Sequence, residues 1–288
     1  MTLAADALRT PLRRIARHIL VRLPVRGKHR FARVVGPLLA PPGIEVIRIG
    51  PIAFPVDHRV DTYRYIYYGA YEANTVRHMR RVLRPGDVCI DAGANIGYIS
   101  AQMAARVGPA GRVYAFEPSR TCTEILSSFF PQAENVEVVA AAVSSQTGTS
   151  AFHDTDRIIT LGYGVLGDRA DQPDGASYDV QTWALDDFCA QHGVEQVRYL
   201  KLDIEGSELA ALNGARTLLQ ERRIDFVHVE ISFAEFEGAR ARDAAIAERL
   251  ATAGYGPHRA RRRGDLAPVR AASYTEAGTR DIVWARVG

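Results

Sequence analysis

Residues 86–118 of the chain read GDVCIDAGANIGYISAQMAARVGPAGRVYAFEP. The short apolar run at 88–90 has turn residues on both sides, which is typical of a buried strand. Apolar residues then recur at helical spacing from Ile96 to Val107, and a Gly-Pro pair ends this pattern. A strand, a glycine loop and a helix in this order predict a nucleotide-binding turn.

The glycine loop at 93–97 favours one of three kinds of ligand. A phosphate-binding P-loop needs a Lys-Ser or Lys-Thr pair at its end, which this loop lacks. The dinucleotide fingerprint needs a second glycine so that the backbone can approach a pyrophosphate, and Asn95 takes that position. Asp91 ends the strand, and its carboxylate would repel a phosphate but suits cationic and hydroxyl groups. The loop therefore favours S-adenosylmethionine, which carries an ammonium, a sulfonium and ribose hydroxyls.

A second expected strand, residues 112–116, is followed by Glu117 and Pro118. In a strand-helix-strand unit, an acidic residue at about this sequence separation from the glycine loop binds the ribose hydroxyls. A surface turn with a helix-capping acid would explain Glu117 alone, but not its occurrence with Asp91 and two loop glycines. The expected cofactor site comprises Asp91, Gly93, Asn95, Gly97, Glu117 and Pro118.

Three motifs together resemble the FkbM family of S-adenosylmethionine-dependent methyltransferases. They are DAGANIG at 91–97, AFEP at 115–118 and LKLDIEGSEL at 200–209, within a similarity that spans residues 44–230. Many methyltransferases share the first two, whereas the third is far more specific to this family. The alternation of strands and helices from Gly86 onward predicts a three-layer α/β domain. The resemblance further implies a Rossmann-like class I methyltransferase fold, with a seven-stranded, mostly parallel sheet and an antiparallel last strand.

Composition is that of a globular enzyme: 288 residues, of which 47% are hydrophobic and 24% charged. The three cysteines are far apart and odd in number, which indicates free thiols in a reducing compartment. No apolar stretch is long enough to span a bilayer, and no secretory signal is apparent. We therefore expect a cytoplasmic protein.

Residues 9–33 contain nine Lys or Arg and no acid. Thr10-Pro11 predicts the start of a helix that ends before Pro24. The apolar face of this helix would contain Leu12, Ile15, Ala16, Ile19, Leu20 and Leu23, with the arginines elsewhere. Such a helix could contact an anionic membrane at its inner face, or pack on the catalytic domain or a second subunit with its arginines solvated; the pattern favours packing. Nucleic-acid binding is not expected, because aromatic residues are sparse there.

The chain divides into three expected segments: a basic extension at 1–42, a hairpin and cap at 43–85, and the methyltransferase domain at 86–288. Because the extension is expected to be peripheral to the chemistry, a chain that starts near Gly43 should keep its activity. Residues 44–56 predict a hairpin that turns at Gly50-Pro51. The tyrosine-dense residues 63–71 predict either a cap or a wall of the substrate pocket.

Two further segments are candidates for cofactor contact. In the resembled family a Gly-x-Tyr-Glu segment precedes the cofactor domain, and residues 69–72 match it, so Glu72 is a candidate; otherwise it favours the start of a helix at 72–82. The small apolar run at 140–143, which includes Ala141, suits an adenine pocket or simply ends the strand at 136–139. Residues 147–178 predict a hairpin and a mobile loop. Other expected elements are helices at 121–130, 185–188, 207–219 and 239–253, and strands at 179–183, 197–202, 224–231 and 281–287.

Acidic residues follow two of these strands, where a parallel sheet presents ligands and catalytic groups. Lys201, Asp203 and Glu205 mark the end of one strand, and Glu230 marks the end of the next. His228 lies inside that next strand, where a histidine is more often a satisfied buried residue than a base. The helix dipole alone explains Glu208. The candidate catalytic residues are Lys201, Asp203, Glu205, His228 and Glu230.

The expected reaction is methyl transfer to a hydroxyl oxygen, which depends on positioning and on a general base. Asp203 or Glu205 is the expected base, while a divalent cation held by Asp203 and Glu230 is an alternative that the spacing does not exclude. The resemblance suggests a sugar, glycan or polyketide hydroxyl as acceptor. Two other classes of function are a catalytically silent cofactor-binding scaffold, which the intact acids disfavour, and an NAD-dependent oxidoreductase, which Asn95 disfavours.

Overall fold

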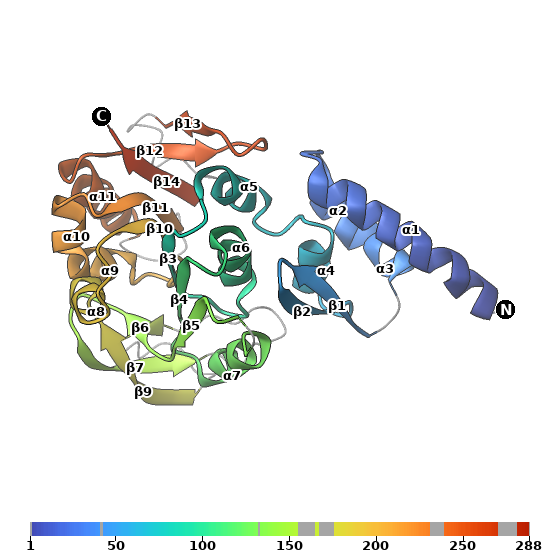
Figure 1. The fold of residues 1–288 in the computed structure, drawn as a ribbon, viewed down its shortest axis with the longest axis horizontal. Coiled ribbons are helices and arrows are strands. Elements are labelled where there is room, and N and C mark those ends of the chain that lie inside the picture. Colours follow the sequence, from blue (N-terminus) through green and yellow to red (C-terminus); the bar gives the residue numbers. More distant parts are fainter. Residues whose placement is uncertain are drawn as a thin grey trace.

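The structure is a computed structural model that describes residues 2–40, 43–131, 133–154, 165–166, 176–230, 239–269 and 281–287. A central eight-stranded sheet has the order β13-β12-β14-β11-β10-β3-β4-β5 (Figure 1). Its strands are β3 (Val88–Ala92), β4 (Arg112–Phe116), β5 (Val136–Val139), β10 (Val197–Leu202), β11 (Ile224–Glu230), β12 (Tyr255–Ala260), β13 (Leu266–Pro268) and β14 (Asp281–Arg286).

The pairing of these strands confirms the expected α/β architecture. Five strands run parallel to one another, in the order β5, β4, β3, β10 and β11. Strand β14 is antiparallel to both of its neighbours, β11 and β12. Six of the strands expected from the sequence lie in this sheet, whereas the one expected at 179–183 lies in a second sheet. No strand was expected at β12, and the short β13 extends the edge beside it. In a parallel sheet covered on both faces, the central strands are buried throughout, which explains their continuous apolar runs.

Helices cover both faces of the sheet (Figure 1). On one side lie α5 (Ala73–Val82), α6 (Tyr98–Val107) and α7 (Arg120–Phe129), and on the other α8 (Leu185–Gln191), α9 (Glu208–Gly214), α10 (Arg216–Gln220) and α11 (Ala239–Thr252). The helix predicted at 207–219 is therefore two helices. The break occurs because Asp186 accepts hydrogen bonds from the backbone N–H groups of Thr217 and Leu218, which begin a new helix.

A second sheet of four strands follows β5, in the order β6-β9-β7-β8. Its strands are β6 (Ala142–Val143), β7 (Gly148–Asp154), β8 (Val165–Leu166) and β9 (Ala176–Trp183). The predicted hairpin is present as the antiparallel pair β7 and β9, and β9 begins three residues before the predicted strand. The rest of the predicted loop, residues 155–164 and 167–175, lies outside the described residues.

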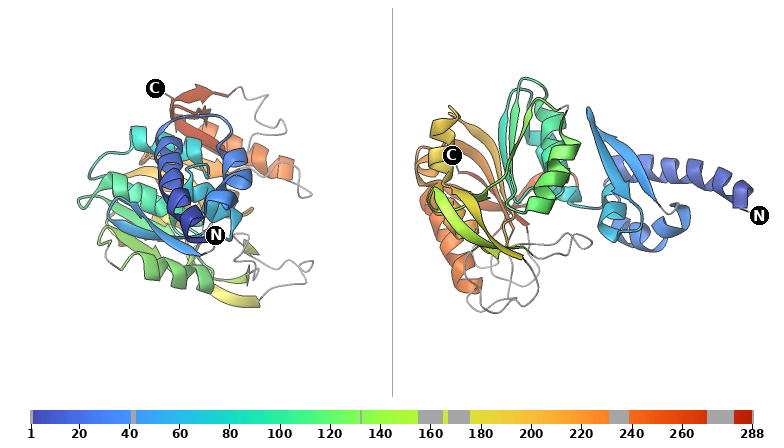
Figure 2. Two further views of the ribbon diagram at one scale, coloured as in Figure 1. Left: turned by 90° about the vertical axis from the view of Figure 1, so that its right-hand side faces the viewer. Right: turned by 90° about the horizontal axis from the view of Figure 1, so that it is seen from below.

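The N-terminal residues form a separate lobe that faces α5 and α6 (Figures 1 and 2). It consists of α1 (Thr2–Arg22), α2 (Lys28–Val34), α3 (Gly36–Leu39), β1 (Ile44–Ile49), β2 (Ile52–Asp57) and α4 (Asp61–Tyr67). The hairpin prediction is confirmed, since Ile49 pairs with Ile52 across the turn. The predicted helix start at Thr10 is wrong, because α1 begins at Thr2 and Pro11 lies inside it. Inside a helix a proline removes one backbone donor and crowds the carbonyl group four residues earlier, which is why the sequence pattern favoured a start beside Pro11.

Helix α1 packs differently from the prediction. Ala16 and Leu20 contact the hydrophobic core, but a stripe of apolar side chains is exposed: Leu12 (54%), Ile15 (56%), Ile19 (45%) and Leu23 (49%). Not all of its arginines are solvated, because Arg13 is buried and pairs with Glu45 at 3.1 Å. Within the described residues, no helix combines the length and apolarity needed to cross a bilayer.

Deletion of residues 1–42 is now expected to destabilise the protein, contrary to the expectation from the sequence. Ala32 is fully buried, and Phe31 packs edge-on against the buried ring of Tyr68 at 5.2 Å. Burial of a large side chain contributes about 1.5–3 kcal/mol, so exposing Tyr67 and Tyr68 should cost about 3 kcal/mol or more. Thermal unfolding of both chains would measure the loss. A truncated chain with an unchanged melting temperature would show that the extension is dispensable.

Candidate active site

A cavity of about 430 Å³ opens where the N-terminal lobe meets the carboxyl ends of β3, β4 and β10. Nine of the predicted site residues line it: Gly93, Asn95, Glu117, Pro118, Ala141, Lys201, Asp203, Glu205 and Glu230. The other four, which are Glu72, Asp91, Gly97 and His228, do not. The fold thus brings the predicted cofactor loop and the predicted catalytic acids to one cavity.

Gly93 holds two of these loops in contact. Its φ is +80°, and a Cβ at this position would lie 1.9 Å from the carbonyl oxygen of Asp203. The N–H of Asp203 in turn donates to Ala92 O at 3.1 Å. A glycine is therefore required here for the close approach of the loop after β10, as well as for the left-handed backbone. By contrast, Gly97 packs against Leu126 and starts α6.

Glu117 is held at the cavity by backbone donors. Its Oε2 accepts from Asn95 N at 2.8 Å and its Oε1 accepts from Ser119 N at 2.9 Å. The side chain is almost fully buried, and this burial raises the pKa of the carboxyl to about 7, against the effect of the two hydrogen bonds. The carboxylate is thus fixed in position, and cavity ligands that donate hydrogen bonds would favour its ionised form.

Asp91 lies beneath the glycine loop, which corrects the expectation that its carboxylate is aimed at the ligand. It is fully buried, does not line the cavity, and accepts a hydrogen bond from Ser100 Oγ at 2.6 Å through Oδ2. Its Oδ1 is buried with no hydrogen-bond partner. Burial raises the pKa of this carboxyl, and the neighbouring Lys201 opposes the rise. In this position Asp91 supports the loop from below and lies beside Lys201, its partner in β10.

Lys201, Asp203 and Glu230 form a charged cluster on the cavity wall. The buried Lys201 Nζ donates to Asp203 Oδ2 at 2.6 Å. Burial alone would raise the pKa of Asp203, but Lys201 and a hydrogen bond from Glu230 outweigh it and lower that pKa. The same hydrogen bond, together with burial, raises the pKa of Glu230. The two shifts are opposite in direction, which favours one proton shared between the two carboxyl groups.

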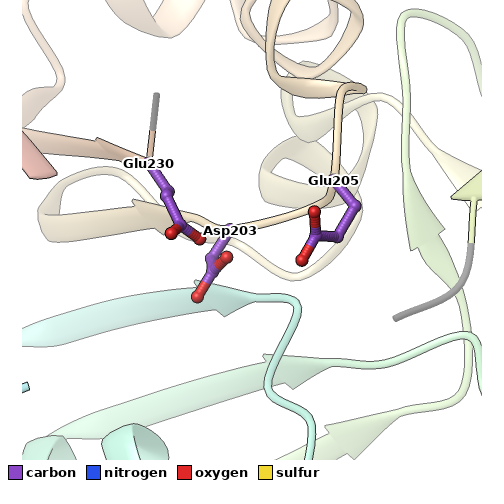
Figure 3. Close-up of side chains that lie close together, drawn as sticks. All are labelled: Asp203, Glu205 and Glu230. Atoms are coloured by element: carbon purple, nitrogen blue, oxygen red, sulfur yellow. The ribbon is translucent and has the colours of Figure 1, made fainter. Parts of the chain in front are cut away.

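Glu205 faces this pair from the other side, as Figure 3 shows. One carboxylate oxygen each from Asp203, Glu205 and Glu230 lies within 4.8 Å of the others. Glu205 has a φ of +48°, which is unusual for a residue other than glycine and is found most often at functional sites. The buried Glu208 fixes this loop, because its Oε1 accepts from Ile204 N at 3.3 Å and from Gly206 N at 3.0 Å. Glu208 is therefore a positioning residue, a role beyond the interaction with the helix dipole that the sequence predicted.

His228 and Glu72 lie behind the cavity. His228 is fully buried in β11, 3.4 Å from the hydroxyl of Tyr199 and 3.3 Å from Asp281 Oδ1. Both ring nitrogens of His228 thus have hydrogen-bond partners, as expected for a buried histidine inside a strand. Glu72 precedes α5 with a φ of +47°, and burial raises the pKa of its carboxyl. Neither residue is placed to contact a molecule in the cavity.

The sequence interpretation missed several lining residues. Tyr65 and Tyr71 come from the tyrosine-dense segment, which favours its interpretation as a wall of the pocket. Phe152 comes from β7 in the second sheet, and His29 and Thr62 come from the N-terminal lobe. No local pattern marks His29 or Thr62, because only the docking of the lobe brings them to the cavity.

A sequence profile described as the Methyltransferase FkbM domain matches residues 91–257, which is more than half of the chain. The chain belongs to the FkbM methyltransferase family. This confirms the resemblance carried by the three motifs, and the protein is accordingly an S-adenosylmethionine-dependent methyltransferase of that family. The matched range begins at Asp91, so the N-terminal lobe of this FkbM methyltransferase lies outside it.

Three curated methyltransferases are similar to part of this FkbM methyltransferase. The 2-O-methyltransferase NoeI of Sinorhizobium fredii (strain NBRC 101917 / NGR234) is 24% identical over 168 residues, which are 54% of this chain and 68% of that protein. Methyltransferase sdnD of Sordaria araneosa is 28% identical over 153 residues, 43% of this chain and 59% of the relative. A protein-L-isoaspartate O-methyltransferase of Triticum aestivum is 34% identical over 107 residues, with 37% and 39% coverage.

Solved structures with a similar arrangement include a methyltransferase FkbM of Methylobacillus flagellatus KT. It is 16% identical with a TM-score of 0.44, and the alignment covers 78% of this chain and 54% of that one. The chain thus spans about half of the length of that protein. The fibrillarin of Aeropyrum pernix, solved with natively bound S-adenosyl-L-methionine, is 14% identical with a TM-score of 0.41, covering 71% of this chain and 68% of that one.

Proposed function

We propose that this FkbM methyltransferase transfers a methyl group from S-adenosylmethionine to a hydroxyl oxygen of a sugar, glycan or polyketide-type acceptor. One observation carries the proposal: Glu117 and the acids that follow β10 and β11 line the same cavity. The name of the relative NoeI, a 2-O-methyltransferase, supports oxygen as the methylated atom. A silent scaffold is disfavoured because carboxylates suited to proton transfer line the cavity. Asn95 in the glycine loop disfavours NAD.

When bound, S-adenosylmethionine supplies an electrophilic methyl group on its sulfonium. Glu117 would accept hydrogen bonds from the ribose hydroxyls, and the N–H groups of Asn95 and Ser119 hold its carboxylate in place. The small side chains of Ala141 and Ala142 and the ring of Phe152 would provide an apolar slot for the adenine. The acceptor would then enter between the tyrosines of the lobe and the acidic cluster.

Glu205 is the residue that we propose as general base. Asp203 is a weak proton acceptor, because Lys201 and Glu230 lower its pKa. The hydrogen bond to Asp203 and burial raise the pKa of Glu230, which favours its neutral form. Glu205 is the remaining acid of the cluster, lines the cavity, and lies on a loop that Glu208 fixes. It would take the proton of the acceptor hydroxyl as the oxygen attacks.

A divalent cation is the alternative to this base. The oxygens of Asp203, Glu205 and Glu230 lie close enough to hold one, and carboxylates are ligands that Mg²⁺ and Mn²⁺ prefer. Such an ion would lower the pKa of an acceptor hydroxyl. However, the Lys201 ammonium lies 2.6 Å from Asp203 and already supplies positive charge there. We therefore propose that Lys201 takes the electrostatic role of a metal.

Removal of metal ions by chelation should leave the turnover nearly unchanged, because the Lys201 side chain supplies the positive charge of the cluster. The measurement compares methyl transfer before and after dialysis against EDTA, with Mg²⁺ or Mn²⁺ added back. Activity that is lost on chelation and restored by one of these ions would instead assign the three carboxylates as metal ligands.

Affinity for S-adenosylmethionine should increase as the pH rises through about 7. Burial raises the pKa of Glu117 to about 7, and ribose hydroxyls donate to the ionised form. The pKa of the Glu117 carboxyl is higher in the folded chain than in the unfolded chain, so its protonated form stabilises the fold. This stabilisation is complete below about pH 4.5 and is lost as the pH rises through about 7. Cofactor binding has the opposite dependence and should be about tenfold weaker at pH 6 than at pH 8. Titration calorimetry on the wild type and on Glu117→Gln, which should show no such change, tests this; equal wild-type affinities at both pH values would contradict the ribose contact.

The proposed reaction itself is tested by incubating the protein with methyl-labelled S-adenosylmethionine and a panel of acceptors. The panel should contain free sugars, oligosaccharides and hydroxylated polyketides, each beside its O-methylated counterpart as the blocked control. We expect label on oxygen in one of these classes only. Label on nitrogen or carbon would reject O-methylation, and cofactor binding without transfer to any class would favour the scaffold.

A further inference from the structure

A second cavity, of about 340 Å³, lies between the N-terminal lobe and the methyltransferase domain. It is lined by arginines from four elements: Arg17 of α1, Arg48 of β1, Arg80 of α5 and Arg106 of α6. Among the described residues, no Asp or Glu lines it. Tyr98 lines both this cavity and the candidate active site, so a single side chain lies between the two.

No described acid lines this cavity, and Glu45, which lines an adjoining cavity with Arg17 and Arg48, pairs with Arg13 instead. Arg80 donates to the neutral Gln102 Oε1 at 3.0 Å, and Arg106 donates to Leu83 O at 3.0 Å. The Nε of Arg17 is buried and has no hydrogen-bond partner. Arginine–carboxylate pairs are common elsewhere in the same structure, for example between Arg13 and Glu45 at 3.1 Å. Among the described residues, none of the four cavity arginines forms such a pair.

Another buried cation lies close to this cluster. Lys28 is buried, and its Nζ donates to the carbonyl oxygens of Leu20 and Gly69. Burial and the charges of Arg77 and Arg80 lower the pKa of Lys28 to about 8. Arg17 is half-buried, whereas Arg48, Arg80 and Arg106 are exposed, so water moderates the repulsion among them. An anion bound among them would neutralise this charge. The geometry therefore favours a ligand that brings at least two negative charges.

We propose that this cavity binds a phosphate or diphosphate group. Guanidinium groups match the oxygens of a phosphate in bidentate geometry, and several converging arginines are the usual means of recognising one. The apolar stripe of α1 is not part of this site. At 100° per residue, Ile15 and Ile19 point about 160° away from Arg17, towards the other side of the helix. The site is therefore separate from any membrane contact through that stripe.

Binding of inorganic pyrophosphate to the full chain tests the proposal. Titration calorimetry should show saturable binding, and the double variant Arg17→Gln/Arg48→Gln should weaken it by about tenfold or more, since hydrogen bonds to charged groups are lost. The matched control is Arg59→Gln, an exposed arginine that pairs with Asp57 outside the cavity. It should change the dissociation constant by less than about twofold. Absence of binding, or equal weakening by the control, would overturn the proposal.

Thermal unfolding of the double variant distinguishes a loss of pyrophosphate binding from a loss of folding. The variant removes like charges but also the contact of the Arg17 guanidinium with the ring of Tyr67, 5.3 Å away. Its melting temperature without ligand should therefore stay close to that of the wild type, while the rise caused by pyrophosphate should be lost. If the double variant does not fold, Arg48→Gln alone serves, since Arg48 is exposed on β1. A variant that folds and still gains the full rise would contradict the site.

Vesicles identify the source of the phosphate. Sedimentation with phosphatidylcholine vesicles, with and without phosphatidic acid, is compared for the wild type and the double variant. Binding to phosphatidic acid that the double variant loses would identify a lipid headgroup. Pyrophosphate binding without such vesicle binding would identify a free or acceptor-borne phosphate. If pyrophosphate does not bind and vesicle binding persists in the double variant, the arginine cavity is not an anion site.

Discussion

Glu205→Gln should lower turnover by at least about 10²-fold, the usual effect of losing a general base. The substitution keeps the shape of the side chain but removes its ability to take a proton. Affinity for S-adenosylmethionine should hardly change, because the predicted cofactor contacts lie on the glycine loop and at Glu117. Single-turnover methyl transfer, with calorimetry of cofactor binding beside it, separates these two effects. The matched control is Glu221→Gln, whose side chain is 57% exposed and lies outside the cavity.

The neighbouring substitution Asp203→Asn should behave differently. It removes the partner of the buried Lys201, and breaking a buried ion pair typically costs about 3–5 kcal/mol. Asp203→Asn should therefore lower the melting temperature as well as the turnover, whereas Glu205→Gln should lower the turnover alone. If Glu205→Gln retains near-normal turnover on the true acceptor, Glu205 is not the base, and Asp203 becomes the next candidate.

Glu117→Ala should weaken binding of S-adenosylmethionine by about 1.5–3 kcal/mol, which is about 10- to 150-fold. Two losses contribute. The ribose hydroxyls lose their proposed acceptor, and the N–H groups of Asn95 and Ser119 lose the carboxylate that orders their loops. Calorimetry should show the change in the dissociation constant, with little effect on the transfer step once the cofactor is saturating.

The control for this prediction is Glu124→Ala, an exposed acid on α7 that does not line the cavity. It should leave affinity within about twofold of the wild type. Wild-type affinity in Glu117→Ala would refute the ribose contact. NAD binding by the wild type in place of S-adenosylmethionine would refute the proposed use of the glycine loop altogether.

The sequence by itself determined the family, the class of fold and nine of the residues that line the candidate active site. These features depend on local patterns, since each motif is a few consecutive residues at the end of a strand. The parallel sheet brings all such strand ends to the same edge. For this reason Gly93, Glu117, Asp203 and Glu205 could be predicted together without knowledge of their distances.

Predictions failed where the direction of a side chain depends on packing. Asp91 ends a strand as expected, yet its carboxylate is enclosed below the loop beside Lys201. Among the described side chains of α1, Ala16 and Leu20 of its apolar face contact the core, and the buried Arg13 takes part of the contact. Helical periodicity shows which side chains share a face, but it does not show which edge of that face a partner covers.

Only the tertiary structure decided the contacts between distant parts of the chain. The opposite pKa shifts of Asp203 and Glu230 depend on the adjacency of β10 and β11, and His29 reaches the cavity only because the lobe docks there. The second cavity joins Arg17 to Arg106, and no periodic pattern connects residues so far apart in sequence. Local sequence specifies the elements and their motifs, whereas the relative positions of these elements follow from burying many apolar surfaces at once, and electrostatic sites between them arise from that packing.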